Sequence, residues 1–179
     1  MRQDEAVSLI TAAVTIRGGV WADLGAGDGT FTRALGSLLG ADGTVYALDQ
    51  NPAALAALSS DRARTAARVI TIVGDFTAPL ELPPLDGVII ANALHYVPYP
   101  DQPRVLREIA SLLTSGGPIV VVEYDRRSAN RWVPYPIAPH ALASAAAEAG
   151  LEPPTLLATR PSHYSGTIYS AIVRRQADR

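Results

Sequence analysis

The sequence predicts an α/β fold, and two patterns carry that prediction. Short apolar runs alternate along the chain with stretches whose apolar residues recur at helical spacing. The runs are apolar on both faces, as in parallel strands that helices cover on each side. Short connections between them favour an open sheet with right-handed crossovers. We therefore expect a seven-stranded, mostly parallel sheet with its last strand antiparallel and helices on both faces.

Seven segments have the composition of strands. Each of the first five is followed at once by a polar residue or glycine, as strands are where they reach the edge of a sheet. The last two are separated by the turn residues of 161–166, which predicts an antiparallel pair. The seven segments are Val20 to Leu24, Thr44 to Leu48, Arg68 to Val73, Leu85 to Ala91, Ile119 to Tyr124, Thr155 to Thr159 and Thr167 to Arg174.

Five segments have the periodicity or the punctuation of helices. Asn51 and Pro52 have the types of a helix cap and a first-turn residue, and Gly150 is a typical helix stop. The five segments are Asp4 to Val14, Thr30 to Leu39, Pro52 to Ser59, Gln102 to Leu113 and His140 to Ala149. The proline-rich segment from Asp125 to Pro139 is expected to be irregular. A chain of 179 residues suits one domain, residues 1–179.

Composition excludes several kinds of chemistry. The chain has no cysteine, and every one of its 15 Lys and Arg residues is arginine. Thiolate metal sites, cysteine nucleophiles and Schiff-base lysines are therefore excluded, and we predict no metal site. The net charge of −2 gives no field that would attract nucleic acid. No apolar run is long enough for a membrane span and the N-terminus is acidic, so we expect a cytoplasmic protein without a membrane partner.

The central motif is a glycine loop between the first strand and the next helix. It carries Asp23, Gly25, Gly27 and Gly29. A dinucleotide loop would place its third glycine at position 30, which is Thr30. The pattern Asp-x-Gly-x-Gly-x-Gly instead resembles motif I of class I S-adenosylmethionine-dependent methyltransferases, whose sheet is Rossmann-like.

This resemblance implies that the glycine loop wraps the methionine part of S-adenosylmethionine. In the family, the acid near the start of the loop helps to anchor the amino group of the cofactor, which assigns that role to Asp23. Charge agrees with this, because a carboxylate attracts an ammonium group and repels a pyrophosphate. A tight glycine turn without any ligand is the alternative interpretation.

The resemblance extends to the ends of the next three strands. Asp49, with Gln50 beside it, stands where an acid binds the ribose hydroxyls of the cofactor. Asp75 and Phe76 match the acid and the ring-packing residue that contact adenine. Asn92 would lie beside the cofactor near the reacting methyl group. For Asp75 and Phe76 the alternative is a solvated turn acid followed by a core aromatic residue.

Three histidines are candidate general bases for a protonated methyl acceptor. Histidine titrates near neutral pH, which suits this work. His95 follows the fourth strand and is the best placed, whereas His140 opens a helix and His163 lies in the last turn. A structural histidine is the alternative for each of them.

The acceptor is expected to lie between His95 and the irregular segment after the fifth strand. That segment carries three arginines, Trp132 and Tyr135. Arginine pairs with acidic groups, and aromatic side chains pack on flat ligands, although both also occur as solvated or anchoring residues. The residues expected to contact the acceptor are Tyr96, Tyr124, Arg127 and Trp132.

The sequence thus predicts an S-adenosylmethionine-dependent methyltransferase that acts on a small molecule. A non-catalytic S-adenosylmethionine-binding module and, less favoured, a nicotinamide-dependent oxidoreductase are the alternatives. The chain is shorter than is typical of the family, so little of it is left to cover the active site. The N-terminal helix within residues 1–17 is expected to cover the cofactor site, and a homodimer is another arrangement that would enclose the acceptor.

Overall fold

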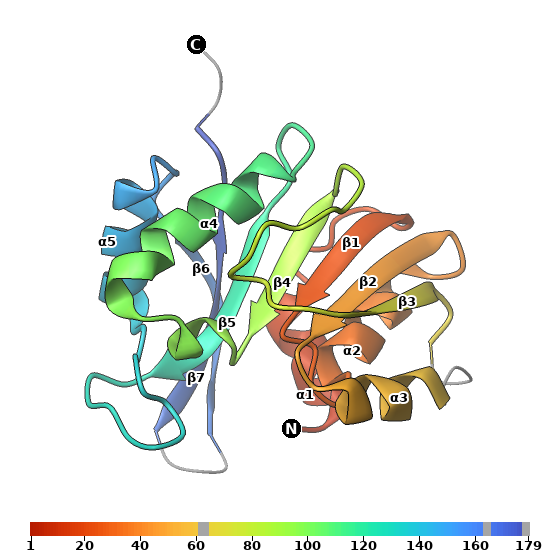
Figure 1. Ribbon diagram of the computed structural model, residues 1–179, viewed down its shortest axis with the longest axis horizontal. Helices are drawn as coiled ribbons and strands as arrows, with labels where there is room; N and C mark the ends of the chain where they lie inside the picture. The colour runs from red at the N-terminus through yellow and green to blue at the C-terminus, as the bar shows by residue number, and fades with distance from the viewer. Residues whose placement is uncertain (61–64, 163–165, 177–179) are drawn as a thin grey trace.

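The fold is one twisted sheet of seven strands in the order β3-β2-β1-β4-β5-β7-β6 (Figure 1). The computed structural model describes residues 1–60, 65–162 and 166–176. Strands β1 to β5 pair in parallel, and β7 is antiparallel to both of its neighbours. The strands are β1 (Gly19–Leu24), β2 (Gly43–Asp49), β3 (Arg68–Val73), β4 (Gly87–Ala91), β5 (Ile119–Asp125), β6 (Thr155–Pro161) and β7 (Thr167–Val173). The predicted fold class is confirmed.

Helices cover both faces of the sheet, as the apolar strands predict. One face carries α1, α2 and α3, and the other carries α4 and α5. The helices are α1 (Gln3–Ile10), α2 (Thr30–Leu39), α3 (Pro52–Ser60), α4 (Gln102–Ser111) and α5 (Pro139–Glu148). The Asn51 side chain accepts hydrogen bonds from the amides of Ala53 and Ala54, which confirms its predicted capping role.

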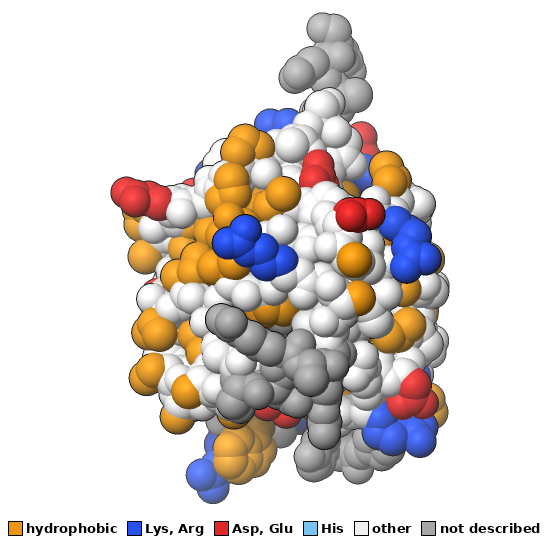
Figure 2. Space-filling view, turned by 90° about the vertical axis from the view of Figure 1, so that its right-hand side faces the viewer, with side chains coloured by type: hydrophobic (Ala, Val, Ile, Leu, Met, Phe, Trp, Pro, Cys, Tyr) orange, Lys and Arg blue, Asp and Glu red, His pale blue; other side chains and the backbone are white. Residues whose placement is uncertain are grey.

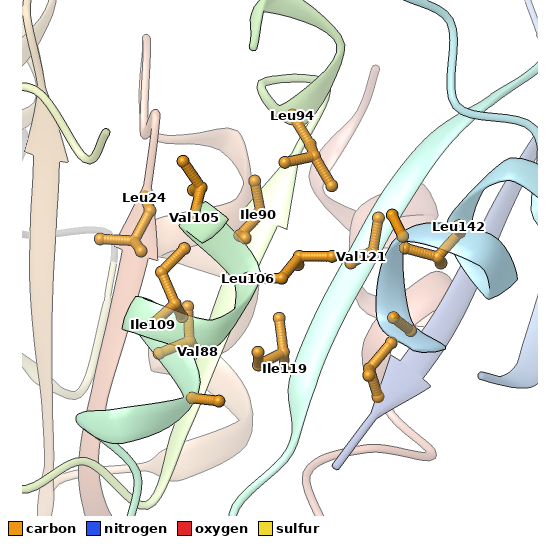
Figure 3. Close-up of a cluster of buried hydrophobic side chains, with 14 of the residues drawn as sticks. Leu24, Val88, Ile90, Leu94, Val105, Leu106, Ile109, Ile119, Val121 and Leu142 are labelled. Carbon is orange, nitrogen blue, oxygen red and sulfur yellow. The ribbon is translucent and has the colours of Figure 1, made fainter. Parts of the chain in front are cut away.

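The larger part of the core lies between the sheet and helices α4 and α5. Figure 3 shows Leu106 and Ile109 of α4 pointing toward side chains of β4 and β5 such as Val88 and Ile119. All four are almost completely buried, with at most 1% of the side chain exposed. Alternate residues of the same strands face the other side, where Ile89 and its neighbours pack against α1 and α2.

Helix α1 lies near the sheet edge that is formed by β6 and β7, the last two strands of the chain. It packs against α2, β6 and β7. The Ser170 hydroxyl of β7 donates to the carbonyl of Leu9 at 2.6 Å, and Arg160 of β6 pairs with Glu5 at 2.5 Å. These contacts fix α1 against one face of the sheet. That residues 1–17 cover the cofactor site remains a prediction.

Several predicted boundaries are wrong at their ends, for local reasons. The first helix ends at Ile10 rather than Val14, because the amide of Ala13 bonds back to the carbonyl of Ile10 and tightens the turn. Helix α4 ends at Ser111, and β4 begins at Gly87. Leu85 and Leu113 instead form an isolated bridge beside the sheet.

The strand β3 forms one edge of the sheet and is less covered than the central strands. Four of its six residues are half-buried, and Val73 is 62% exposed. Figure 2 views the molecule from this side and shows hydrophobic side chains spread among charged groups. Over the described ranges, no helix has the length and apolar character needed to cross a membrane.

The core predicts a large difference between two leucine-to-alanine substitutions. Leu106 is fully buried in α4, whereas Leu156 of β6 is 54% exposed. Leu106→Ala is expected to lower the free energy of unfolding by about 2–5 kcal/mol, because it removes buried apolar surface and leaves a cavity. Leu156→Ala is expected to cost less than about 1 kcal/mol. Urea denaturation followed by circular dichroism measures both, and equal losses would contradict this packing.

Candidate cofactor and acceptor site

The candidate site lies at one edge of the sheet, where the parallel strands β1 to β5 all end. Figure 1 shows the arrowheads of β1 and β4 pointing to this edge. The chain leaves β1 toward β2 on one side, while β4 pairs with β1 on the other. Such a reversal of strand order opens a crevice at the carboxyl ends of the strands, which is where open α/β sheets bind ligands.

The glycine loop after β1 is packed tightly except at its middle glycine. The amides of Gly25 and Ala26 both donate to the carbonyl of Leu48, at 2.8 and 2.9 Å. A Cβ on Gly25 would stand 2.5 Å from the methyl group of Ala93. Gly27 has a φ of 53°, and a Cβ built there meets nothing within 4 Å. The loop therefore presents bare backbone to open space at Gly27.

Asp49 joins the end of β2 to the glycine loop. One carboxylate oxygen accepts the amide of Gly27 at 2.8 Å, and the other accepts the amide of Asn51 at 2.8 Å. Each carboxylate oxygen has more than one acceptor direction, so these bonds leave room for further donors. Gln50, its neighbour, is exposed. Asp49 thus lies against the glycine loop, and the sequence predicted that the two contact the same ligand.

Asp23 is a buried carboxylate with an unpaired oxygen. Its side chain is 1% exposed, and Oδ2 accepts the hydroxyl of Thr32 at 2.6 Å. The other oxygen, Oδ1, is buried without a hydrogen-bond partner among the described residues. Burial raises the pKa of Asp23 from its ordinary value of 3.8 to about 6, and the bond from Thr32 opposes this shift. A positively charged ligand group would relieve the cost of this buried charge.

Asp75 and Phe76 follow β3 and have different surroundings. One oxygen of Asp75 accepts both the amide and the hydroxyl of Thr77, at 2.8 and 2.7 Å. This bonding orders the turn after β3. Phe76 is half-buried and lies close to Gly25, since its ring would be 3.7 Å from a Cβ placed there. Phe76 is therefore beside the glycine loop, as the predicted site requires.

Asn92 adopts a strained backbone at the end of β4. It has a φ of 51°, and over the described residues it is the single non-glycine with a positive value. Its amide donates to the carbonyl of Val122 at 2.8 Å, while its side-chain Oδ1 is buried without a described partner. Strain of this kind collects at functional sites, where surrounding structure holds it in place.

A buried histidine–glutamate pair lies next to Asn92. His95 is in the short 3-10 helix η2 (Leu94–Tyr96), and Glu123 is in β5. Nδ1 of His95 lies 2.7 Å from one oxygen of Glu123, and the backbone amide of His95 donates to the other at 3.2 Å. The two side chains are 3% and 1% exposed. Because a carboxylate can only accept, Nδ1 carries the proton and Nε2 is left as the basic nitrogen.

A cavity of about 700 Å³ opens beside this pair, in the region where the sequence placed the acceptor. The residues that line it come from the link after β4, the end of β5, the following loop and the start of β7. They include Asn92, His95, Tyr96, Tyr124, Asp125, Arg126, Trp132 and Thr167. Cavities of roughly 300–1,000 Å³ hold small molecules. Asn92 lines the cavity, and the next residue, Ala93, lies beside Gly25 of the glycine loop.

The loop that walls this cavity is anchored at two points. The amide of Tyr135 donates to the carbonyl of His95 at 3.0 Å. The hydroxyl of Tyr169, a fully buried residue of β7, donates to the carbonyl of Ile137 at 2.5 Å. Burial raises the pKa of Tyr169, which keeps its hydroxyl a donor. The loop is thereby held against the same strands that carry His95 and Glu123.

The sequence identified most, but not all, of the residues around the cavity. Tyr96, Tyr124 and Trp132 line it, whereas Arg127 is exposed and absent from the lining. Its neighbour Arg126 lines the cavity.

The two other candidate bases are placed differently. His140 is exposed on α5, and His163 lies outside the described residues.

Glu123, the buried partner of His95, is a residue to which the sequence assigned no role. The sequence did contain a sign of this pairing, because Glu123 is an acid inside an otherwise apolar strand, and such a residue needs a buried partner.

Over the described part of the chain, no group of three or more histidine, aspartate or glutamate side chains is arranged to hold a metal ion.

Comparison with known families settles which proteins this chain resembles. A family model described as a methyltransferase domain matches residues 22–117, which is more than half of the chain. The chain belongs to this family. The match runs from β1 through the glycine loop to the turn before β5. Comparison with curated proteins gives no match.

Solved methyltransferases share the fold. The CcbJ methyltransferase from Streptomyces caelestis has a TM-score of 0.74 at 19% identity, over 98% of this chain and 90% of its own. Magnesium protoporphyrin IX methyltransferase from Synechocystis PCC 6803, solved with bound S-adenosylmethionine, has a TM-score of 0.69 at 16% identity, over 96% and 77%. Mitomycin 7-O-methyltransferase MmcR has a TM-score of 0.69 at 20% identity over 97% of this chain. The chain spans about half of MmcR, or 53% of its length.

The buried Asp23 predicts a pH dependence of stability. Its raised pKa means that the folded protein holds a proton between pH 4 and 6 that the unfolded chain has released. The contribution of Asp23 to stability therefore falls as pH rises through this window, by about 3 kcal/mol at most, and is constant above it.

Asp23→Asn is expected to remove this contribution. The difference in unfolding free energy between the variant and the wild type should grow in favour of the variant from pH 4 to pH 6.5. Urea denaturation at several pH values measures it. The same substitution at exposed Asp42 is the control and should leave the difference constant. A constant difference for Asp23→Asn would contradict the raised pKa.

Proposed function

We propose that this protein transfers a methyl group from S-adenosylmethionine to a hydroxyl group of a small molecule, with His95 as the general base. The observation that carries the proposal is the buried pair of His95 and Glu123 in the wall of a cavity that also reaches Asn92. A neutral histidine with one nitrogen fixed by a carboxylate is suited to remove a proton from an acceptor. The family supplies the reaction class, and the cavity supplies room for the acceptor.

S-adenosylmethionine is the cofactor of this methyltransferase family, as the glycine loop predicted. The residues present fit such a cation. Open space at Gly27 admits a ligand against the backbone, and the unpaired oxygen of buried Asp23 suits a positively charged amino group. We assign Asp49 to the ribose hydroxyls, and Asp75 and Phe76 to the adenine.

Gln50 and Asn92 were also predicted to contact the cofactor, and their surroundings support these contacts less strongly. Gln50 is exposed beside Asp49, so we place it at the rim of the ribose site. Asn92 has a buried, unpaired Oδ1 and also lines the acceptor cavity. We therefore place Asn92 at the boundary between the two sites.

The protein supplies orientation and one proton acceptor. When bound, S-adenosylmethionine would supply an activated methyl group, which passes to the nucleophile in an in-line displacement that releases S-adenosylhomocysteine. Holding an acceptor hydroxyl close to that methyl group, in the right orientation, accounts for much of the rate enhancement that an enzyme can provide. Nε2 of His95 takes the hydroxyl proton, and Glu123 stabilises the imidazolium that forms.

The other interpretations have less support. A non-catalytic binding module would have no use for a buried basic histidine in the wall of a cavity of this size. A nicotinamide-dependent oxidoreductase disagrees with the family and with Thr30 in the loop. We retain three expectations from the sequence: a single domain, a cytoplasmic location and a small-molecule partner without nucleic acid. A homodimer is retained as one way to cover the acceptor site.

Asp49→Ala is expected to weaken the binding of S-adenosylmethionine and S-adenosylhomocysteine at least tenfold. It removes the acceptor for the ribose hydroxyls and the bond to Gly27 that shapes the loop. Titration calorimetry measures the affinities, with NAD as a third ligand that should not bind. The exposed Asp42→Asn variant is the control. Unchanged affinity in Asp49→Ala would contradict the ribose assignment, and binding of NAD alone would refute the proposed cofactor.

His95→Gln and Glu123→Gln are expected to lower the rate of methyl transfer without weakening the binding of the cofactor. We expect a loss of about 10²–10⁴-fold for His95→Gln, the usual contribution of a general base, and a smaller loss for Glu123→Gln. The measurement is transfer of labelled methyl from S-adenosylmethionine to a metabolite extract, with S-adenosylhomocysteine affinity measured in parallel. His140→Gln, on exposed α5, is the matched control. Full transfer by His95→Gln would refute its role as base.

A further inference from the structure

We propose that the methyl acceptor is a planar aromatic hydroxy acid, held by its carboxylate at Arg126 and by its ring among Tyr96, Tyr124 and Trp132. This inference rests on the proposed function, because the hydroxyl is the group that His95 would deprotonate. It adds the substrate class, which neither the family nor the fold specifies. Three features of the cavity carry it.

The first feature is the aromatic wall. The rings of Tyr96 and Tyr124 both lie near His95 in the lining, with ring centroids 4.4 and 6.1 Å from the imidazole and both planes tilted against it. Trp132 lines the same cavity from the loop and is 64% exposed, although a large aromatic side chain is usually buried. An exposed indole at a cavity mouth is suited to pack against a flat ligand.

The second feature is the strength of the base. A neutral histidine is a weak base, so it deprotonates a phenol more readily than an aliphatic alcohol. A phenol such as the tyrosine side chain has a pKa of about 10, whereas water, a non-aromatic hydroxyl compound, has a pKa of about 15.7. His95 has one carboxylate partner, Glu123, at Nδ1, which fixes the orientation of its ring. A phenolic hydroxyl is therefore the oxygen that this site suits best.

The third feature is the charge at the mouth. Arg126 is half-buried in the lining, and the one described hydrogen bond of its side chain joins Nε to the carbonyl of Ser128 at 2.8 Å. That bond orients the guanidinium and leaves its terminal nitrogens for a ligand. Arg131 lies over the ring of Trp132, 4.6 Å from its centroid, and adds a second positive charge.

Asp125 is the opposing charge in this wall. It lines the cavity but is exposed, so water screens its carboxylate more than it screens half-buried Arg126. The other acid near the cavity, Glu123, is engaged by two donors of His95, which leaves Arg126, with Arg131 outside the lining, to favour a ligand with a negative group. A planar guanidinium binds a carboxylate through two parallel hydrogen bonds, which fixes the ring in one orientation.

Direct binding tests the inference without a methyl-transfer assay. The probe is 6-hydroxy-2-naphthoic acid, which carries a phenol and a carboxylate on one flat ring system. Its methyl ester keeps the ring and the hydroxyl but has no charge. Titration calorimetry with the whole chain, with S-adenosylhomocysteine present, should give at least tenfold tighter binding of the acid than of the ester.

Variants at adjacent arginines show whether Arg126 makes this distinction. Arg126→Gln is expected to abolish the preference for the acid, whereas Arg127→Gln, one residue further along and outside the lining, should retain it. Arg126→Lys also loses the bond to Ser128 but keeps the charge, and should retain most of the preference. Loss of preference in Arg126→Lys equal to that in Arg126→Gln would mean that loop structure, and not charge, is responsible, and would overturn the inference.

The outcomes separate this inference from the proposed function. Equal binding of acid and ester, or no binding of either while S-adenosylhomocysteine binds, overturns the substrate class and leaves the proposed function standing. Preferential binding of the acid with no affinity for S-adenosylmethionine or S-adenosylhomocysteine supports the cavity assignment and refutes the proposed function. An equal loss of preference in Arg127→Gln and Arg126→Gln also overturns the assignment to Arg126.

Discussion

The pairing of β4 with β1 on one side and with β5 on the other is the constraint on which the candidate site depends. The glycine loop follows β1, Asn92 follows β4, and Glu123 belongs to β5. Parallel register brings these ends to one edge, although the residues lie far apart along the chain. The strands themselves are almost wholly apolar and buried, and packing against helices on both faces holds them in place. The apolar core thereby fixes the relative positions of the polar groups at this edge.

Those polar groups are costly in such surroundings, and the cost explains their arrangement. Glu123 lies in an otherwise apolar strand and is compensated by two donors of a single residue, His95. Asp23 is compensated by only one hydroxyl, and its pKa rises accordingly. A buried pair is stable only when both partners remain, whereas a buried group with an open acceptor is completed by a ligand. The two acids therefore suit different tasks, one positioning a base and the other receiving a cation.

Much of the fold could be predicted from the sequence because continuous apolar runs and glycine stops are local signals. The glycine loop and the acid at Asp49 were also visible, since fixed spacing along the chain places them. The pairing of His95 with Glu123 spans 28 residues and depends on strand order, which spacing alone does not give. Arg126 and Arg127 were not distinguished, because strand alternation stops at Asp125 and no periodicity shows which side chain turns inward. Helix ends such as Ile10 depend on single turns, which sequence patterns locate poorly.

The position of β7 has a consequence for the order in which the two halves of the site can form. The cofactor half uses β1 to β4, which all lie within the first 91 residues of the chain. The acceptor half needs β7, which inserts between β5 and β6 and supplies both Thr167 in the cavity wall and the Tyr169 bond to the loop. During synthesis the chain emerges from its N-terminus, so every strand of the cofactor half is available before the strand that closes the candidate acceptor cavity.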